Sequence, residues 1–173
     1  MSFSEQSRYE DLLQRYLQPL RRLTWSYARD HAECDDLLQE IALALWTALP
    51  RFRGESSERT WLYRIAHNTS ISYLADRKRR TSRESNAPVV TEPASKNDTP
   101  EAEAIDRQKQ QQLWSAIREL PVSDRQVIIL YLEGMSPAEI EAVTGFTSGS
   151  IATRLTRIRQ RLAARLRREE TRA

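Results

Sequence analysis

Apolar residues recur every three or four positions along most of the chain, a spacing that places them on one face of an α-helix. In the N-terminal part they are Tyr9, Leu12, Leu13, Tyr16, Leu17, Leu20 and Leu23. A second helix is predicted to begin near Asp35 and to end at Pro50, with a buried face of Leu38, Ile41, Ala42, Leu45 and Leu49. A third is predicted over residues 60–80, with a buried side of Trp61, Leu62, Ile65, Thr69 and Ser72. The pattern indicates a helical N-terminal module.

The C-terminal part keeps this periodicity and adds turn signals. A helix over residues 105–120 is broken at Pro121, and Ser123 is the candidate N-cap of the next helix, which ends at Gly134. Residues 136–139 (SPAE) match a capping box with proline at the first helical position. A short helix, a turn containing Gly145 and a longer helix from near Ser148 follow. This order predicts a helix-turn-helix over residues 136–161.

Between the two parts the periodicity stops. Residues 81–103 contain no aromatic residue and three prolines, so they cannot bury enough apolar surface to become ordered. We predict small helical domains at residues 1–83 and 105–173, joined by a flexible linker at 84–104, with net charges of +3, +4 and −4 respectively. Only four glycines occur in 173 residues, whereas tight β-hairpins depend on glycine. The expected fold class is all-α.

The longer C-terminal helix carries its charge on one face. Ser150, Arg154, Arg157 and Arg161 lie together beside an apolar stripe, and no acid occurs between Ser148 and Arg168. A solvated helix usually mixes signs, because acid–base pairs one turn apart stabilise it. We therefore favour DNA as the partner of this face over the alternative of a basic surface helix.

Two further surfaces of the N-terminal module are candidates for binding. Opposite its apolar face, the second helix presents Leu43 among the polar residues Asp36, Gln39, Glu40 and Thr47. This arrangement fits either a partner-binding patch or a solvated face with one stray leucine. The third helix ends in four successive cations, Arg77, Lys78, Arg79 and Arg80. Cations at a helix C-terminus interact favourably with the dipole, but four exceed that need, so we expect phosphate contacts as well.

The remaining chemistry argues against an enzyme. Cys34 is the single cysteine, the two histidines are isolated, and no glycine-rich phosphate loop occurs. A carboxylate metal site built from Asp35, Asp36 and Glu40 is a weak alternative, since Asp35 and Asp36 cannot both point inward from one helical face. We expect no catalytic residue, metal or cofactor. No signal peptide or apolar run of membrane-spanning length is present, so we expect a cytoplasmic protein without membrane insertion.

With these residues in view, the chain resembles bacterial sigma factors of the extracytoplasmic-function (ECF) type, which contain only the second and fourth sigma regions. The resemblance to the second region rests on residues 35–40 (DDLLQE), Trp46, residues 51–54 (RFRG), residues 59–66 (RTWLYRIA) and Asn68. The resemblance to the fourth rests on Gly145, Phe146, residues 149–151 (GSI), Arg154, Leu155 and Arg157. Ala152 departs from the family, where many members carry a polar or basic side chain.

The resemblance implies roles for both modules. The acidic helix would bind core RNA polymerase through Asp35, Asp36, Gln39, Glu40 and Leu43. The following loop and helix would hold an unstacked base and single strand of the minus-ten element through Phe52, Arg53, Arg59, Thr60, Trp61, Arg64, Asn68, Arg77, Lys78, Arg79 and Arg80. Trp61 also fits the role of a core indole. The helix-turn-helix would bind the minus-thirty-five duplex through Ser150, Thr153, Arg154, Thr156, Arg157, Arg159 and Arg161.

The implied function is a transcription initiation factor that directs core polymerase to promoters and helps to melt the minus-ten element. Members of the family commonly have an anti-sigma partner, which we expect here also. The alternative from another class is a two-domain DNA-binding repressor or adaptor that does not engage polymerase. Substitution of Glu40 and Leu43 distinguishes the two, because only the sigma factor depends on that face for polymerase binding.

Overall fold

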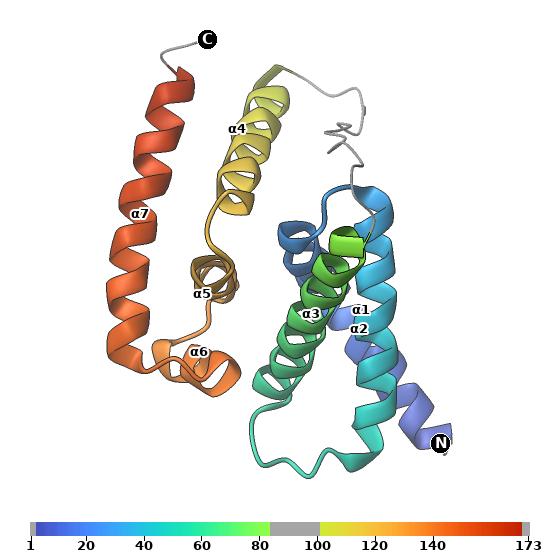
Figure 1. The fold of residues 1–173 in the computed structure, drawn as a ribbon. Helices are drawn as coiled ribbons and strands as arrows, with labels where there is room; N and C mark the ends of the chain where they lie inside the picture. The colour runs from blue at the N-terminus through green and yellow to red at the C-terminus, as the bar shows by residue number, and fades with distance from the viewer. Residues whose placement is uncertain (1–2, 84–100, 171–173) are drawn as a thin grey trace. The chain divides into compact units, whose positions relative to one another are not determined.

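The computed structural model describes residues 3–83 and 101–170, and the secondary structure within these stretches is helical (Figure 1). This confirms the all-α fold class. The elements are α1 (Phe3–Tyr27), α2 (His31–Ala48), the short 3-10 helix η1 (Leu49–Arg51), α3 (Glu58–Arg83), α4 (Glu101–Arg118), α5 (Val122–Leu132), α6 (Pro137–Thr144) and α7 (Ser148–Glu170). Most of the predicted linker, residues 84–100, lies outside the described residues, while residues 101–104 begin α4.

The chain divides into two compact units, the first containing α1–α3 and the second built mainly from α4–α7. In the first unit, α1, α2 and α3 pack on one another around fully buried leucine, isoleucine and tyrosine side chains. The hydroxyl of Tyr9 on α1 donates to the carbonyl of Ala42 on α2 at 2.9 Å, and the Tyr9 ring meets Trp46 edge-on at 4.8 Å. These contacts fix the crossing of the first two helices.

Helix α2 begins at His31, four residues before the predicted start. Asp30 is its N-cap, and the Asp30 carboxylate accepts a hydrogen bond from the backbone N–H of Glu33 at 2.9 Å. Its buried face includes Leu37, whereas the predicted Leu38 and Ala42 are only half-buried. The prediction was wrong at these positions because α2 packs against both α1 and α3, and this packing buries Leu37 in place of Leu38.

The predicted buried side of α3 was also largely wrong. Trp61, Ile65 and Thr69 are half-buried and Ser72 is exposed; of the predicted set only Leu62 is fully buried. The buried stripe instead consists of Thr60, Leu62, Tyr63, Ala66, His67 and Ser70, and a hydrophobic pattern does not select its polar members Thr60, His67 and Ser70. The hydroxyl of Ser70 donates to the carbonyl of Ala66 at 2.7 Å, which satisfies the buried polar group within the helix.

The second unit contains the predicted helix-turn-helix. Ser136 caps α6 in a complete capping box with Glu139, and Gly145 ends α6 with a φ of 75°, a conformation that favours glycine. The predicted N-cap of α5 is wrong, because Pro121 occupies that position and Ser123 lies within the helix. The apolar stripe of α7 is buried as predicted at Ile151, Leu155 and Ile158.

Candidate nucleic-acid and polymerase interfaces

The arginine face of α7 is anchored inside the second unit. The carboxylate of Asp124, near the start of α5, is fully buried and accepts hydrogen bonds from Arg154 Nη1 at 2.7 Å and Arg157 Nη2 at 2.6 Å. Arg161 Nη1 reaches the second carboxylate oxygen at 3.5 Å. Three arginines predicted to contact DNA therefore share one internal acid, which sequence periodicity within α7 did not reveal.

The other predicted duplex-binding residues lie around this cluster. Ser150 Oγ accepts from Arg154 Nε at 3.3 Å. Thr153 and Thr156 are exposed, and their hydroxyls donate to the carbonyls four residues earlier at 3.0 and 3.1 Å. Arg159 lies apart, donating to the Tyr131 hydroxyl at 2.8 Å with its guanidinium over that ring. The structure thus brings Ser150 and three arginines together and separates Arg159 from them.

The start of α7 is held by an acid that sequence analysis missed. The Glu141 carboxylate on α6 accepts from the Ser148 backbone N–H at 3.1 Å and also from the Ser148 hydroxyl. Thr147 Oγ1 accepts from the Ser150 N–H at 3.3 Å. An acid at a helix N-terminus satisfies unpaired N–H groups and interacts favourably with the dipole. The relative position of the two helices in the motif therefore has a polar as well as an apolar basis.

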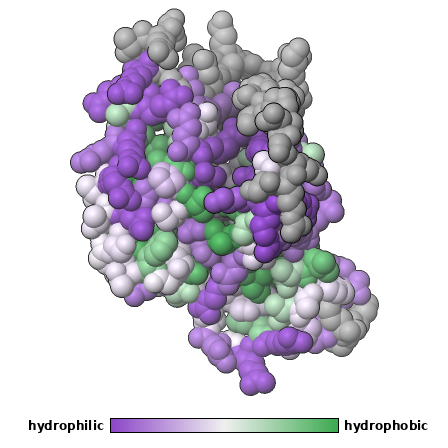
Figure 2. Space-filling view, viewed as in Figure 1, coloured by the Kyte–Doolittle hydropathy of each residue, from purple (hydrophilic) through white to green (hydrophobic). Residues whose placement is uncertain are grey.

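Figure 2 shows how hydropathy varies along α7 on the visible face. Hydrophilic side chains cover the region of its C-terminal half, while paler residues lie around its start. The first turns of α7 contain the exposed small residues Gly149, Ala152 and Thr153. Small side chains at the start of the second helix permit close approach of a duplex, with cations farther along to meet phosphates.

In the first unit, the predicted polymerase-binding face of α2 is exposed. Asp35, Asp36, Gln39 and Glu40 are solvent-accessible, and Leu43 is 65% exposed. Asp35 lies 3.7 Å from Arg21 of α1 in an exposed ion pair. A single exposed leucine is common on protein surfaces, so this exposure is consistent with both the partner-binding patch and the solvated face considered from the sequence.

This face continues into an open groove of about 630 Å³ between α2, η1 and α3. The groove has charged groups at Glu40 and Arg51 and otherwise mostly small or apolar walls; it is lined by Glu40, Leu43, Ala44, Thr47, Ala48, Arg51, Trp61 and Thr69. Residues predicted for polymerase binding, Glu40 and Leu43, therefore share one groove with Trp61, which was predicted for single-strand binding. Sequence periodicity does not indicate that these sites adjoin.

Phe52, in the loop after η1, forms an aromatic pair with Trp61 of α3. The rings of Phe52 and Trp61 lie 4.8 Å apart at an interplanar angle of 37°, and the Arg8 guanidinium lies over Phe52. Trp61 is half-buried, so it combines partial packing with an accessible edge. Glu58 at the start of α3 pairs with Arg15 at 2.9 Å and Arg8 at 3.5 Å, which ties the loop to α1.

The remaining predicted single-strand residues are distributed unevenly. Arg53, Arg64 and Asn68 are exposed, and the Arg59 guanidinium lies over the Tyr63 ring at 5.9 Å. Thr60 is buried: its Oγ1 accepts from the Ser57 hydroxyl at 2.8 Å, and its N–H donates to the same hydroxyl oxygen at 3.1 Å. These contacts make Thr60 part of the α3 start.

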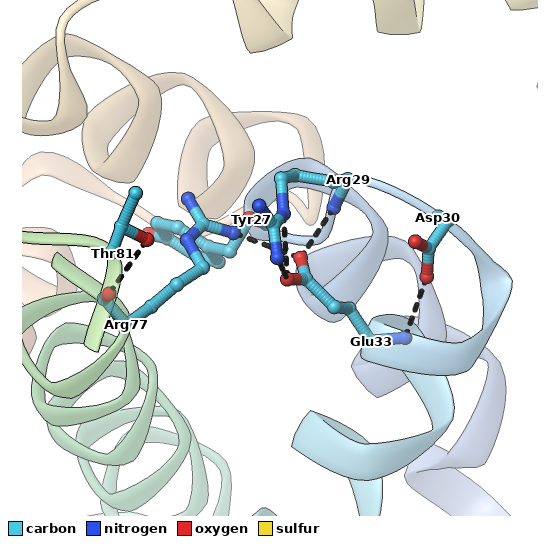
Figure 3. Close-up of polar contacts among 6 residues, drawn as sticks. All are labelled: Tyr27, Arg29, Asp30, Glu33, Arg77 and Thr81. Carbon is cyan, nitrogen blue, oxygen red and sulfur yellow. Dashed lines mark hydrogen bonds and ion pairs between the residues drawn. The ribbon is translucent and has the colours of Figure 1, made fainter. Parts of the chain in front are cut away.

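The basic end of α3 is bound to a second internal acid, Glu33 of α2 (Figure 3). Arg77 Nη1 donates to Glu33 Oε2 at 2.9 Å and to the Tyr27 carbonyl at 3.1 Å. Glu33 also accepts from the N–H and Nε of Arg29 at 2.8 and 2.7 Å. Burial opposes ionisation of Glu33, but the hydrogen bonds from Arg29 and the charge of Arg77 outweigh it and lower the pKa of the carboxyl. Arg77 therefore fastens α3 to the α1–α2 connection.

The neighbouring cations differ from Arg77. Arg79 pairs with Asp76 on the same helix, and the side chains of Lys78 and Arg80 are exposed. Among the described residues no group of three histidine, cysteine, aspartate or glutamate side chains has the geometry to hold a metal ion. No helix in the described ranges has the length and apolar character needed to cross a membrane.

Comparison with known proteins accounts for both units. Residues 12–80 match the family model of Sigma-70 region 2, and residues 110–162 match that of Sigma-70, region 4. The chain is 30% identical over 159 residues to the ECF RNA polymerase sigma-E factor of Haemophilus influenzae, a match covering 86% of this chain and 82% of the relative. The chain belongs to the ECF family of RNA polymerase sigma factors. The resemblance stated from the sequence is confirmed.

Further relatives agree with this assignment. The sigma-E factor of Escherichia coli K12 is 29% identical over 163 residues, covering 90% of this chain and 85% of that protein. Among solved structures, the co-crystal structure of the sigma factor RpoE with the anti-sigma factor NepR from Bartonella quintana matches with a TM-score of 0.69 and 25% identity, covering 91% of this chain and 98% of that chain. The structure of CnrH with the cytosolic domain of CnrY matches with a TM-score of 0.65 and 25% identity, over 93% and 88% of the two chains. The ECF sigma factor described here directs RNA polymerase to promoters for transcription initiation.

Proposed function

We propose that the two units of this sigma factor divide promoter recognition between them: α7 binds the minus-thirty-five duplex, and the α2–α3 groove connects polymerase binding to capture of the melted minus-ten strand. The observation that carries the proposal is the shared groove, in which exposed Leu43 and the indole of Trp61 line one surface. Unstacking a base costs a few kcal/mol, which contacts with a base pocket and aromatic faces offset. Because the groove adjoins the polymerase-binding face, binding of polymerase would help to offset the free energy of unstacking.

On this proposal the acidic face binds core polymerase by shape and charge. Exposed Leu43 supplies an apolar anchor, and the carboxylates around it supply charge complementarity to a basic partner surface. Single-strand contacts come from the Phe52–Trp61 pair and from exposed cations including Arg53, Lys78 and Arg80. Duplex contacts come from Thr153, Thr156, Arg157 and Arg161 of α7. The protein acts by binding and not by catalysis, in the cytoplasm where polymerase and chromosome are present.

We further propose an anti-sigma protein as a regulatory partner. The support is that two structurally similar proteins were solved with protein partners, RpoE with the anti-sigma factor NepR and CnrH with the cytosolic domain of CnrY. The exposed apolar side chain of Leu43 would be a suitable target, because a protein covering it would block polymerase binding without touching α7.

Run-off transcription tests the proposal. Purified core polymerase is incubated with genomic fragments, with and without the chain, and the transcript start sites are mapped. We expect specific starts that require the chain, and their loss in a Glu40→Ala, Leu43→Ala double variant. Leu17→Ala, which truncates an exposed leucine on α1, is the matched control. Promoter-sized duplex binding without any specific start would instead support a repressor or adaptor.

A further inference from the structure

Asp124 is the fully buried acid on which the basic face of α7 converges. Its side chain has 0% exposure, yet it accepts hydrogen bonds from arginines on three successive turns of another helix. A buried carboxylate without partners is costly, whereas charge-assisted hydrogen bonds from guanidinium groups compensate that cost. One negative charge surrounded by three positive ones leaves the cluster strongly cationic. Such an arrangement orients positive charge without neutralising it.

Arg154 is enclosed by the cluster. Besides Asp124, its Nη1 donates to the Ser123 hydroxyl at 3.0 Å, its Nε donates to Ser150 Oγ, and its guanidinium lies 4.6 Å from the Phe146 ring centre. Its side chain is 24% exposed. Bidentate recognition of guanine needs two parallel N–H groups of the fork to be accessible. Each bidentate edge of the guanidinium includes Nε or Nη1, and both of these nitrogens donate within the protein. Arg154 therefore joins α5, the turn and α7 as an internal strut.

Arg157 and Arg161 are held differently. Each reaches Asp124 through one terminal nitrogen, and their side chains are 47% and 51% exposed. The other N–H groups of each guanidinium remain available for further hydrogen bonds. Holding a long side chain by one end removes rotamer freedom before a ligand arrives, so less conformational entropy is lost on binding.

We propose that Asp124 is a positioning residue for promoter recognition: it fixes Arg154 as a strut and pre-orients Arg157 and Arg161 toward the minus-thirty-five duplex. This inference rests on the proposed role of α7 in duplex binding. It divides the arginines of one helix face into a structural member and two DNA-contacting members, a distinction that their common face does not reveal.

The test compares Asp124→Asn with Glu119→Gln. Glu119 accepts hydrogen bonds through both carboxylate oxygens from Arg165 of α7 at 3.1 Å. Glu119→Gln therefore removes one negative charge that pairs with an α7 arginine, as Asp124→Asn does, but outside the Asp124 cluster. The full chain is assembled with core polymerase. Binding is measured on a promoter duplex mapped by run-off transcription and on the same duplex with its upstream element shuffled.

We expect Asp124→Asn to weaken binding to the intact promoter by about tenfold, the size of one lost base or phosphate contact, without weakening binding to the shuffled duplex. Glu119→Gln should leave the ratio of the two affinities unchanged. An Asp124→Asn variant that changes both affinities equally, or matches Glu119→Gln, would overturn the inference. If the unsubstituted chain supports no promoter-specific binding, the proposed function itself fails.

A second pair of variants keeps the inference testable if Asp124→Asn does not fold. Arg157→Gln should make the salt dependence of promoter binding shallower by about one unit in the log–log slope, because one phosphate contact is lost. Arg154→Gln should leave that slope unchanged while lowering the melting temperature. Equal slope changes in the two variants would contradict the assignment of Arg154 as a strut.

Discussion

The basic face of α7 and the basic end of α3 were both predicted to bind nucleic acid, and both contain an arginine held by a buried acid. Glu33 lies 44 positions from Arg77, and Asp124 lies 30 positions from Arg154. The two acids differ in what they connect. Glu33 ties Arg77 to the α1–α2 connection, whereas Asp124 collects several arginines of one helix and leaves two of them half-exposed. The arginines of one basic cluster therefore differ in how far the protein encloses them, and the exposed fraction of the side chain separates Arg154 from Arg157 and Arg161.

The largest expected difference between the units is their response to acid. Burial lowers the pKa of His67 in α3 from its ordinary 6.5 to about 4. Because the unfolded chain binds the proton first, stability is fully present above about pH 6.5 and falls by about 3 kcal/mol as the pH decreases to 4. Urea unfolding followed by tryptophan fluorescence should show this, since Trp25, Trp46 and Trp61 report on the first unit. A His67→Gln variant should lack this loss; an unchanged pH dependence would contradict it.

Glu33 extends the acid sensitivity of the first unit. Its pKa is lowered in the folded state, so the stability it contributes is present above its unfolded pKa and is lost as the pH falls below that value. In the His67→Gln variant this second loss should remain. Adding Glu33→Gln should remove it, and persistence of the loss in the double variant would assign it to another group.

The next largest effect concerns the anchor of α3. Arg77→Ala should destabilise the first unit by about 2 kcal/mol, because Glu33 loses a charged partner while it keeps Arg29. Arg80→Ala, three positions later and exposed, is the matched control and should change stability by less than about 0.5 kcal/mol. The free energy of unfolding in urea gives both values. If the two variants lost the same free energy of unfolding, the ion pair with Glu33 would not make Arg77 more important for stability than Arg80.

In nucleic-acid binding the two variants should rank in the opposite order, with the larger effect from Arg80→Ala. Arg80→Ala should weaken binding to a melted minus-ten strand and make its salt dependence shallower by about 0.7 units, the value for one phosphate of a single strand. Arg77→Ala, measured below its unfolding transition, should leave the slope unchanged. Fluorescence anisotropy with polymerase holoenzyme and a forked promoter probe provides the measurement. A larger slope change for Arg77→Ala would place that arginine among the DNA contacts.

Sequence periodicity predicted the helix-turn-helix because its signals are local. Ser136, Glu139 and Gly145 act within one or two turns, and the stripe of α7 that is buried against α4 and α5 consists of apolar residues, which a hydrophobic pattern selects. The motifs of the second and fourth sigma regions likewise identified the family before the fold was known. Local signals and sequence motifs were therefore sufficient to predict the fold class and the function.

The failures share one physical cause. The buried stripe of α3 contains Thr60, His67 and Ser70, which a hydrophobic pattern rejects. The anchors Glu33 and Asp124 become recognisable only when distant segments meet. Periodicity reports which face of a helix is apolar, but it does not report which cations on the other face already have partners.

The most direct test of the account observes the arginine side chains themselves. Side-chain NMR of the full chain, with guanidinium resonances assigned by single substitutions, can be recorded with and without a mapped minus-thirty-five duplex. We predict slow guanidinium rotation for Arg77 and Arg154 in the free protein, with no change on adding duplex, and large shifts for Arg157 and Arg161. If the Arg154 resonances shift as much as those of Arg157, the division between anchoring and DNA-contacting arginines is contradicted.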